Sequence, residues 1–507
     1  MPDPVINLPS EIAILIFRKL RLHEIVHCML VSKTWYYSID RWPVLWSRID
    51  TNSMPERIRP AMVLRQWGVE NGDASSIASK SAEGDFMDVT RSLHDRNIST
   101  LARRAGPALR RLSLSFSPHI TDAGIYSVIH YGCVNIRYLA LLANTHISSD
   151  TLVALIGYIS RTLENFVLST AKTDDAVVKK ALSCAPNLVH LDLSYCRLVT
   201  DDAFPRPEYM SDVDRQALPQ LRVLVLNGCM RVGDVSVGRI GRAFGTSLQT
   251  LDISHTIATT RCLCFLAVAA NIKQGQSRAI RGPLSLQTLY MNNIAFEPGP
   301  RHIRSEVDVG IHFNVATWSI DQFYQYAPQL TSLTIAGKNY MVTDEFIAQI
   351  ARNCHQLTFI DVRDSVRVGH PSLFALSEHC AGLEYANFDG CVSCLDTGVL
   401  ALVRGCLRLK GLNLSELGIT NTSLVAIGNN LHYLETLVLD MCQLISTDGI
   451  KAVVEGPSGM GCMFTLTELS FMRCRRVHNE VVEWCKQRLK PNAIVRSGFS
   501  LADMDVS

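Results

Sequence analysis

A register of apolar residues, L-x-x-L-x-L, recurs thirteen times between Leu109 and Phe471, and it constrains the fold more than any other feature. Each copy is followed by a turn and then by a helix-like stretch, as in LVHLDLSYCRLVTDDAF from Leu188. Successive side chains of a strand point to opposite faces, so the leucines point inward and the residues between them point outward. One such unit cannot bury its own apolar face, and neighbouring copies have to stack on both sides of it.

The spacing between the copies identifies the type of repeat. The registers begin at Leu109, Ile136, Leu163, Leu188, Leu221, Leu248, Leu286, Leu330, Leu357, Leu383, Leu409, Leu434 and Leu466. Most spacings are 25 to 27 residues. That period is within the range of leucine-rich repeats and is too short for tetratricopeptide or ankyrin units. The pattern therefore predicts an α/β fold, a right-handed horseshoe solenoid of about 13 leucine-rich repeats over residues 95–490.

Cysteines recur at fixed places in the repeat. Five stand three residues after the last apolar strand position: Cys196, Cys229, Cys391, Cys442 and Cys474. A thiol is small and tolerates burial, so we expect reduced core positions at tight turns and no disulfides. Cys391 and Cys394 form a C-x-x-C pair, but no second pair stands at zinc-finger spacing, so we expect no metal site. With turns such as Ile-Thr-Asp at 120–122, the repeats resemble the cysteine-containing leucine-rich-repeat subtype.

The first fifty residues follow a different pattern. The segment from Leu8 to Trp46, LPSEIAILIFRKLRLHEIVHCMLVSKTWYYSIDRWPVLW, contains a run at 12–17 that is apolar on every side of a helix. Such a helix must be covered from more than one direction, and a domain of some forty residues has too little chain to cover it alone. A partner protein would provide the cover; the alternative is a three-helix cap on the solenoid.

This segment resembles the F-box. The family pattern is a Leu-Pro opening, an acidic and apolar first helix, Val-Ser-x-x-Trp and a closing Leu-Trp, and the chain matches it throughout. The resemblance implies docking on a Skp-type adaptor through Leu8, Pro9, Glu11, Ile12, Ile16, Leu20, Val31, Ser32, Trp35, Leu45 and Trp46. The expected domains are an F-box at 1–50, a connecting helix and flexible linker at 51–94, the solenoid at 95–490 and a C-terminal tail at 491–507.

Composition and motifs limit the possible activities. The net charge is near +2, which gives no reason to expect nucleic acid as the main partner. The run at 12–17 is too short to span a membrane and follows no basic segment, so we expect a cytoplasmic or nuclear protein without a signal peptide. The chain contains no P-loop, G-x-S-x-G, H-E-x-x-H or G-x-G-x-x-G motif, and we expect no catalytic site, no cofactor and no homo-oligomer.

An F-box followed by leucine-rich repeats resembles the substrate receptors of SCF-type cullin ubiquitin ligases. The resemblance implies that the F-box docks on the adaptor, and through it on a cullin, while the concave repeat face holds a protein substrate. Such a receptor is not itself catalytic, because it acts by bringing the substrate near a ubiquitin-loaded enzyme. Two alternatives remain: a repeat scaffold that works without ubiquitination, and an inhibitor-type module that blocks an enzyme by wrapping it.

Outward-facing strand residues indicate where a substrate would bind. They include six carboxylates (Asp192, Asp252, Asp361, Asp389, Asp440 and Glu468) and two arginines (Arg111 and Arg363). Exposed aromatics often supply the binding energy of an interface. We therefore expect a basic or apolar, unphosphorylated segment to bind at Tyr290, Phe359, Asp361, Tyr385 and Asp389. The insertions at 203–217 and 294–312 follow a strand, and we expect them on the rim that borders the concave sheet.

Overall fold

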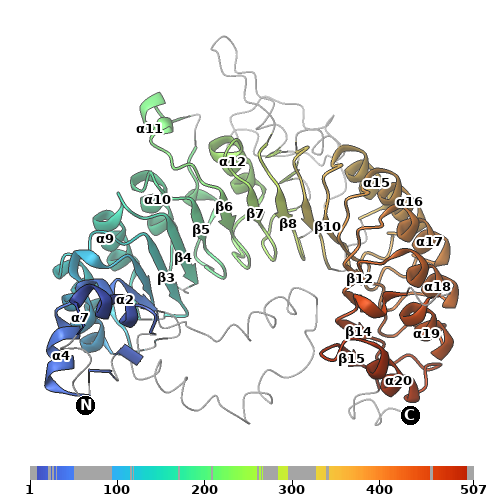
Figure 1. The fold of residues 1–507 in the computed structure, drawn as a ribbon. Helices are drawn as coiled ribbons and strands as arrows, with labels where there is room; N and C mark the ends of the chain where they lie inside the picture. Colours follow the sequence, from blue (N-terminus) through green and yellow to red (C-terminus); the bar gives the residue numbers. More distant parts are fainter. Residues whose placement is uncertain are drawn as a thin grey trace, which may run out of the picture. The chain divides into compact units, whose positions relative to one another are not determined.

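The computed structural model describes residues 8–498 except 21–23, 26–27, 30, 51–93, 115–116, 118, 145, 170–171, 207–208, 260–261, 264, 267–283, 295–326, 338–341 and 457–460. The chain divides into two compact units, unit 1 (Met1–Arg231) and unit 2 (Val232–Ser507). In each unit the strands form one layer and the helices the other (Figure 1). No helix among the described residues is long and apolar enough to cross a bilayer.

Unit 1 contains a sheet whose strands pair in parallel and in chain order. Its strands are β1 (Arg48–Asp50), β2 (Arg111–Ser113), β3 (Tyr138–Leu142), β4 (Asn165–Ser169), β5 (His190–Asp192) and β6 (Val223–Val225). Its helices are α2 (Ser10–Phe17), α4 (Lys33–Asp40), η1 (Pro43–Trp46), α7 (Asp95–Ala105), η3 (Gly106–Ala108), α8 (Asp122–His130), α9 (Ser149–Ile159), α10 (Asp175–Cys184), η4 (Asp201–Ala203) and α11 (Asp212–Gln216).

Unit 2 continues the same strand and helix alternation, again with parallel pairing in chain order. Its strands are β7 (Thr250–Asp252), β8 (Thr288–Tyr290), β9 (Ser332–Thr334), β10 (Phe359–Asp361), β11 (Tyr385–Asn387), β12 (Gly411–Asn413), β13 (Thr436–Val438), β14 (Glu468–Ser470) and β15 (Ile494–Arg496). Its helices are α12 (Asp234–Phe244), α15 (Asp344–Asn353), α16 (His370–His379), α17 (Asp396–Gly405), α18 (Asn421–Asn430), α19 (Thr447–Glu455), η8 (Cys462–Phe464) and α20 (Glu480–Arg488).

The predicted repeat solenoid is confirmed. All thirteen registers read from the sequence coincide with strands β2 to β14, and no register-opening residue is more than 3% exposed. The leucines of successive strands therefore form a continuous apolar layer between the strands and the helices, as the outward and inward alternation requires.

Two strands lie outside the predicted solenoid. Arg48–Asp50, at the end of the predicted F-box, forms β1 and pairs with β2. Ile494–Arg496, predicted as part of a tail, forms β15 and pairs with β14. Neither segment carries the full leucine register, and each becomes a strand because a neighbouring strand offers it hydrogen-bonding groups. Residues 51–93, most of the predicted linker, lie outside the described residues.

The predicted cysteine turns are buried. The residue before each of the five cysteines has a positive φ, as at Tyr195 (61°) and Gly390 (69°), and this bend turns the thiol inward. Each thiol donates to a carbonyl of the preceding repeat, for example Cys391 Sγ to Val362 O at 3.2 Å. Burial raises the pKa of the Cys442 thiol to about 12, so these sulfurs are poor nucleophiles. The cysteines that the structure describes are free thiols.

Aspartates at the first turn of repeat helices tie each repeat to the next. The Asp175 carboxylate accepts the Thr200 N–H at 2.7 Å and the Thr200 hydroxyl at 2.6 Å. Equivalent pairs are Asp95 with Thr121, Asp234 with Thr259, and Asp396 with Thr420. Thr200 in turn caps η4 by accepting from Asp202 N–H. These bonds account for the recurring Thr-Asp turns seen in the sequence.

Removal of the Asp396 carboxylate should destabilise unit 2 in a pH-dependent way. Burial opposes ionisation, but hydrogen bonds from Ser423 and Thr420 outweigh it and lower the pKa of Asp396. A lowered pKa gives stability that is present above about pH 4, the unfolded pKa, and is lost as the pH falls through the folded pKa. We expect Asp396→Ala to reduce the free energy of unfolding by about 1.5 kcal/mol at pH 7, after allowance for solvent screening.

Urea denaturation at pH 7 and pH 3 measures this effect. The exposed Asp448 at the first turn of α19 provides a control, and Asp448→Ala should change the midpoint little at either pH. A loss for Asp396→Ala that is equal at both pH values would contradict the role given to its ionised form.

Candidate functional site

The N-terminal helices of unit 1 enclose a small aromatic core. Ala13 and Phe17 are the buried residues of α2. The Phe17 ring meets Trp35 edge-on, with 5.4 Å between the ring centroids, and lies 6.1 Å from Trp42. The Ser32 hydroxyl caps α4 by accepting the Trp35 N–H at 3.2 Å. This core uses one side of α2 and leaves the other side open.

The open side of α2 is apolar. Leu8, Ile12, Leu15 and Ile16 are between 37% and 56% exposed. The last three share one face of α2 by their spacing, and Leu8 lies just before the N-cap Pro9. Val31 and Val44 are also exposed. Burial of an apolar side chain is favourable, so a small domain rarely leaves so many uncovered in one place. The surface is therefore suited to contact with another protein.

A cleft of about 580 Å³ lies beside this face. Its apolar lining includes Leu15, Leu20 and Ile25. Its polar lining comprises Arg18, Lys19, Ser47, Arg48 and Asp50. Leu15 and Val44 belong both to the cleft and to the exposed apolar set. The sequence analysis missed these two residues, although Leu15 follows Leu8 at helical spacing.

Structure separates the predicted adaptor residues into two groups. Leu8, Pro9, Glu11, Ile12, Ile16 and Val31 are exposed, and Leu20 is half-buried. Ser32 and Trp35 serve the internal contacts described above. Leu45 and Trp46 are buried, and Leu45 also lines the cleft beside α2, so their part in adaptor binding stays a prediction. They are covered because η1 packs against α7, the first helix of the repeats.

Arg104 of α7 joins the N-terminal helices to the repeats. Its guanidinium lies 4.9 Å from the Trp46 ring, and its Nε donates to Asp40 Oδ1 at 2.5 Å. The Trp46 indole N–H donates to the Ile39 carbonyl at 3.1 Å. The first repeat helix and the N-terminal helices thus share one packed core.

Family models agree with this division of the chain. Residues 5–52 match the F-box-like model, and residues 184–203 match a leucine-rich-repeat model. The chain combines an F-box with leucine-rich repeats. Proteins with this combination are typically non-catalytic adaptors.

Curated relatives of this F-box and repeat chain are distant. F-box/LRR-repeat protein 5 of Bos taurus is 23% identical over 249 residues, which is 48% of this chain and 30% of the relative. The Mus musculus protein of that name is 22% identical over the same shares. The match therefore spans about a third of the length of these relatives.

Two solved structures match this chain at low sequence identity. One is the yeast Rad7 and Elc1 complex, with a TM-score of 0.44 and 16% identity over 87% of this chain and 96% of that chain. The other is an internalin, inlF, from Listeria monocytogenes, with a TM-score of 0.46 and 15% identity over 84% of this chain and 95% of that chain.

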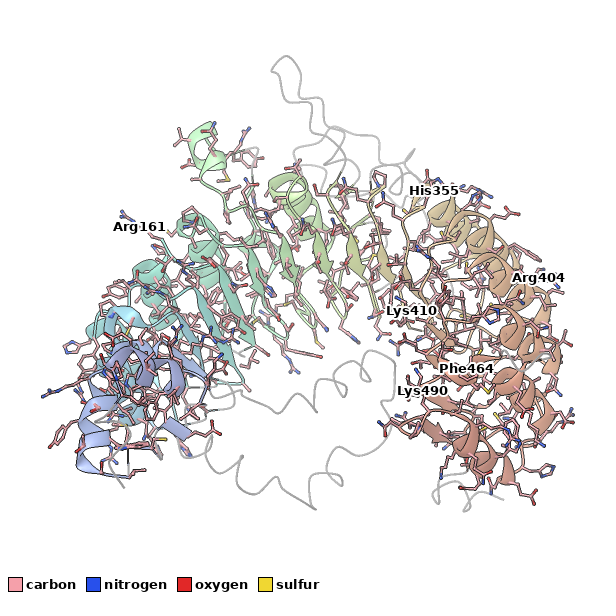
Figure 2. All side chains as sticks on the ribbon, in the orientation of Figure 1. Arg161, His355, Arg404, Lys410, Phe464 and Lys490 are labelled. Atoms are coloured by element: carbon pink, nitrogen blue, oxygen red, sulfur yellow. The ribbon has the colours of Figure 1, made fainter. Side chains whose placement is uncertain are left out.

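The second candidate site is the strand face of unit 2, formed by the outward residues of β7 to β15. Figure 2 shows Arg404 on the helix side of this unit and Lys410 on the strand side. Strand register places Phe359 beside Tyr385, with 6.2 Å between the ring centroids. Tyr290 lies two strands away from Phe359 and in the other outward column, because it aligns with Thr334 and through it with Asp361. The predicted aromatic trio is therefore a pair.

The two predicted carboxylates differ in exposure. Asp361 is only 3% exposed and pairs with Arg363 at 2.9 Å, so little of its carboxylate is available to the predicted basic segment. Asp389 is half-buried in the turn after β11. Burial raises the pKa of Asp361 to about 6, although Arg363 opposes this. Burial also raises the pKa of Asp389 to about 6, with a further increase from Glu416 and Asp364.

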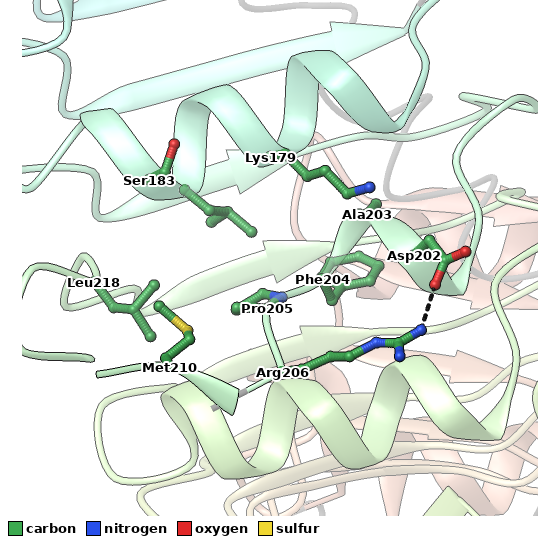
Figure 3. Close-up of a pocket in the computed structure, with 10 residues that line it drawn as sticks. Lys179, Ser183, Asp202, Ala203, Phe204, Pro205, Arg206, Met210 and Leu218 are labelled. Carbon is green, nitrogen blue, oxygen red and sulfur yellow. Dashed lines mark hydrogen bonds and ion pairs between the residues drawn. The ribbon is translucent and has the colours of Figure 1, made fainter. Parts of the chain in front are cut away.

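The insertion at 203–217 contributes to a pocket of about 400 Å³ in unit 1 (Figure 3). Phe204, Pro205 and Met210 line it from the insertion, and Lys179 and Leu182 line it from α10. The expected position on the sheet rim is therefore wrong. Because η4 begins where other repeats begin their helix, the insertion occupies the helix layer. Residues 295–312 of the other insertion lie outside the described residues.

Proposed function

We propose that this chain is the substrate-recognition subunit of an SCF-type cullin–RING ubiquitin ligase. The observation that carries the proposal is the exposed apolar face of α2, Leu8 to Ile16, within the segment that matches the F-box-like model. A Skp-type adaptor would cover this face and the adjoining cleft. The adaptor would connect the chain to a cullin, and the repeats would hold the protein substrate.

The structure of unit 1 fits a positioning role. Arg104 and Trp46 pack the F-box against α7, so an adaptor bound to α2 has a defined relation to the first repeats of the unit. A receptor that increases the local concentration of a substrate needs such a rigid connection, because proximity is its whole contribution to the reaction. No group of His, Cys, Asp or Glu residues among the described residues could hold a metal ion.

Affinity purification from cells tests this proposal. Wild-type chain should recover a Skp-type adaptor together with a cullin. Ile16→Glu, which places a charge on the half-exposed face of α2, should recover neither and should increase the abundance of the substrate in quantitative proteomics. Adaptor without cullin would instead support a scaffold that acts without ubiquitination. Recovery of neither by the wild-type chain would overturn the proposal.

A point substitution is preferable to deletion of residues 1–50. That deletion would remove β1, which pairs with β2, and would expose the apolar underside of α7 that now covers Trp46. An effect of the deletion on the substrate could then come from damage to the repeats.

A further inference from the structure

Carboxylates line the turns after four consecutive strands of unit 2. This carboxylate row comprises Asp361, Asp364, Asp389, Glu416 and Asp440, at the ends of β10 to β13. Adjacent turns stack directly, because Asp364 N–H donates to the Asp389 carbonyl at 2.7 Å and Glu416 N–H to the Asp440 carbonyl at 2.8 Å. The row therefore concentrates negative charge along one edge of the strand face.

The fold neutralises this charge incompletely. Arg363 pairs with Asp361 and also lowers the pKa of Asp389, but burial and the like charges of Glu416 and Asp364 outweigh it and raise the pKa of Asp389 to about 6. Lys410 does not neutralise the row, because it precedes β12 and its ammonium pairs with Glu384 at 2.8 Å, at the other end of the strands (Figure 2). At neutral pH the ionised row is thus a cost to folding that a bound cation would relieve.

Two buried polar groups beside the row also need a partner. Thr334 Oγ1 and Arg363 Nε find no hydrogen-bond partner among the described residues, although both residues are more than nine-tenths buried. Thr334 is the register neighbour of Asp361 in β9, and Arg363 binds Asp361 through its other nitrogen. Unpartnered buried polar atoms are rare and costly. Both atoms lie beneath the surface, so a ligand on this face does not contact them directly.

Aromatic rings flank the row on the same face. Phe359 and Tyr385 stand two residues before Asp361 and Asn387, which along a strand is roughly 7 Å. The Tyr385 ring extends over Gly411 of the next strand, where an added Cβ would be 2.5 Å from Tyr385 Cδ1. Glycine is thus required for the ring to lie flat there. A flat ring on this face suits an apolar side chain or the stem of a lysine or arginine side chain.

We propose that this part of the strand face binds an unphosphorylated basic segment of a partner protein, with an apolar part of the segment over Tyr385 and a separate arginine or lysine side chain between Asp389 and Glu416. This inference rests on the proposed function only for the identity of the partner, which would then be the substrate of the ligase. Phosphate groups are disfavoured, because the row would repel them.

Binding of a short labelled peptide of alternating arginine, leucine and serine to the full chain tests the inference. We expect saturable binding by fluorescence anisotropy, a loss of about tenfold for Asp389→Asn and for Tyr385→Ala, and no binding of the peptide with phosphorylated serines. Asp448→Asn removes an exposed carboxylate from α19 and should leave the affinity unchanged. Equal binding by wild type and Asp389→Asn would overturn the proposal.

Thermal unfolding separates a binding role from a structural one. Asp389→Asn removes the unfavourable charge and should raise the melting temperature while it weakens binding. A lower melting temperature would make Asp389 a structural residue and overturn the proposal. If calcium raises the melting temperature of the wild type but not of Asp389→Asn, the carboxylate row binds a metal ion, and the proposal of a basic peptide is overturned. Asp389→Asn should capture the adaptor as the wild type does, because Asp389 lies outside the F-box. If the wild type itself fails to capture the adaptor, the proposed function is overturned, but the inference about peptide binding is not.

Discussion

Alanine at both Leu8 and Pro9 should weaken capture of a Skp-type adaptor by two orders of magnitude or more. Leu8 is exposed at the start of the apolar face, and Pro9 is the N-cap residue of α2. Burial of a large apolar side chain is worth roughly 1.5 to 3 kcal/mol, and each 1.4 kcal/mol is about tenfold in affinity. Because neither residue lies in the aromatic core around Phe17, the repeats should stay folded. Titration of purified adaptor against the full chain measures the loss.

Tyr126 provides a matched control for that experiment. It is an exposed aromatic of α8 in the same unit, outside the F-box, and Tyr126→Ala should bind the adaptor as the wild type does. Circular dichroism should show the same helix content in all three proteins. Capture of adaptor by the double variant at the wild-type level would mean that α2 does not carry the interface.

Arg104→Ala should loosen the F-box from the repeats. The Arg104 side chain is about 10% exposed, pairs with Asp40 and lies over Trp46. Loss of Arg104 leaves Asp40 with only the exposed Arg103 and removes the packing over Trp46, which together cost about 3 kcal/mol. We expect hydrogen exchange of the α4 amides to accelerate roughly a hundredfold in the full chain, because local opening becomes easier by that amount.

The neighbouring Arg103 separates this effect from a general loss of positive charge. Arg103 lies 4.0 Å from the same Asp40 carboxylate, but 53% of its side chain is exposed. Arg103→Ala should change exchange of the α4 amides by less than about twofold, as expected for a surface ion pair. Equal acceleration by the two variants would show that packing over Trp46 does not matter.

Repeat architecture could be read from the sequence because it depends on local spacing. A strand with leucines at L-x-x-L-x-L has one apolar face whatever its neighbours are, and thirteen copies in phase require stacking. The five cysteine turns were predictable for the same reason. β1 and β15 were not, because Ile49 and Val495 lack a register and become strand residues only through pairing with β2 and β14.

The adaptor surface was predicted in part. The face of α2 follows from helical spacing, so Leu8, Ile12 and Ile16 could be placed together. Leu45 and Trp46 belong to the same sequence motif, but their burial depends on α7, which is about fifty residues away in the chain. A motif match identifies which residues recur together and does not show which of them face a partner.

The strand face of unit 2 shows most clearly which features the sequence determines and which depend on the tertiary structure. The sequence by itself determined that Tyr290, Phe359, Tyr385, Asp361 and Asp389 point outward, since side chains alternate along a strand. The registers opening at Leu286 and Leu357 also imply that Tyr290 stands in another column than Phe359. Tertiary structure alone decided that the Phe359 and Tyr385 rings meet and that Arg363 pairs with a buried Asp361. The physical reason is that alternation is a property of one strand, whereas ring contacts, burial and the pKa of a carboxylate depend on the strands beside it.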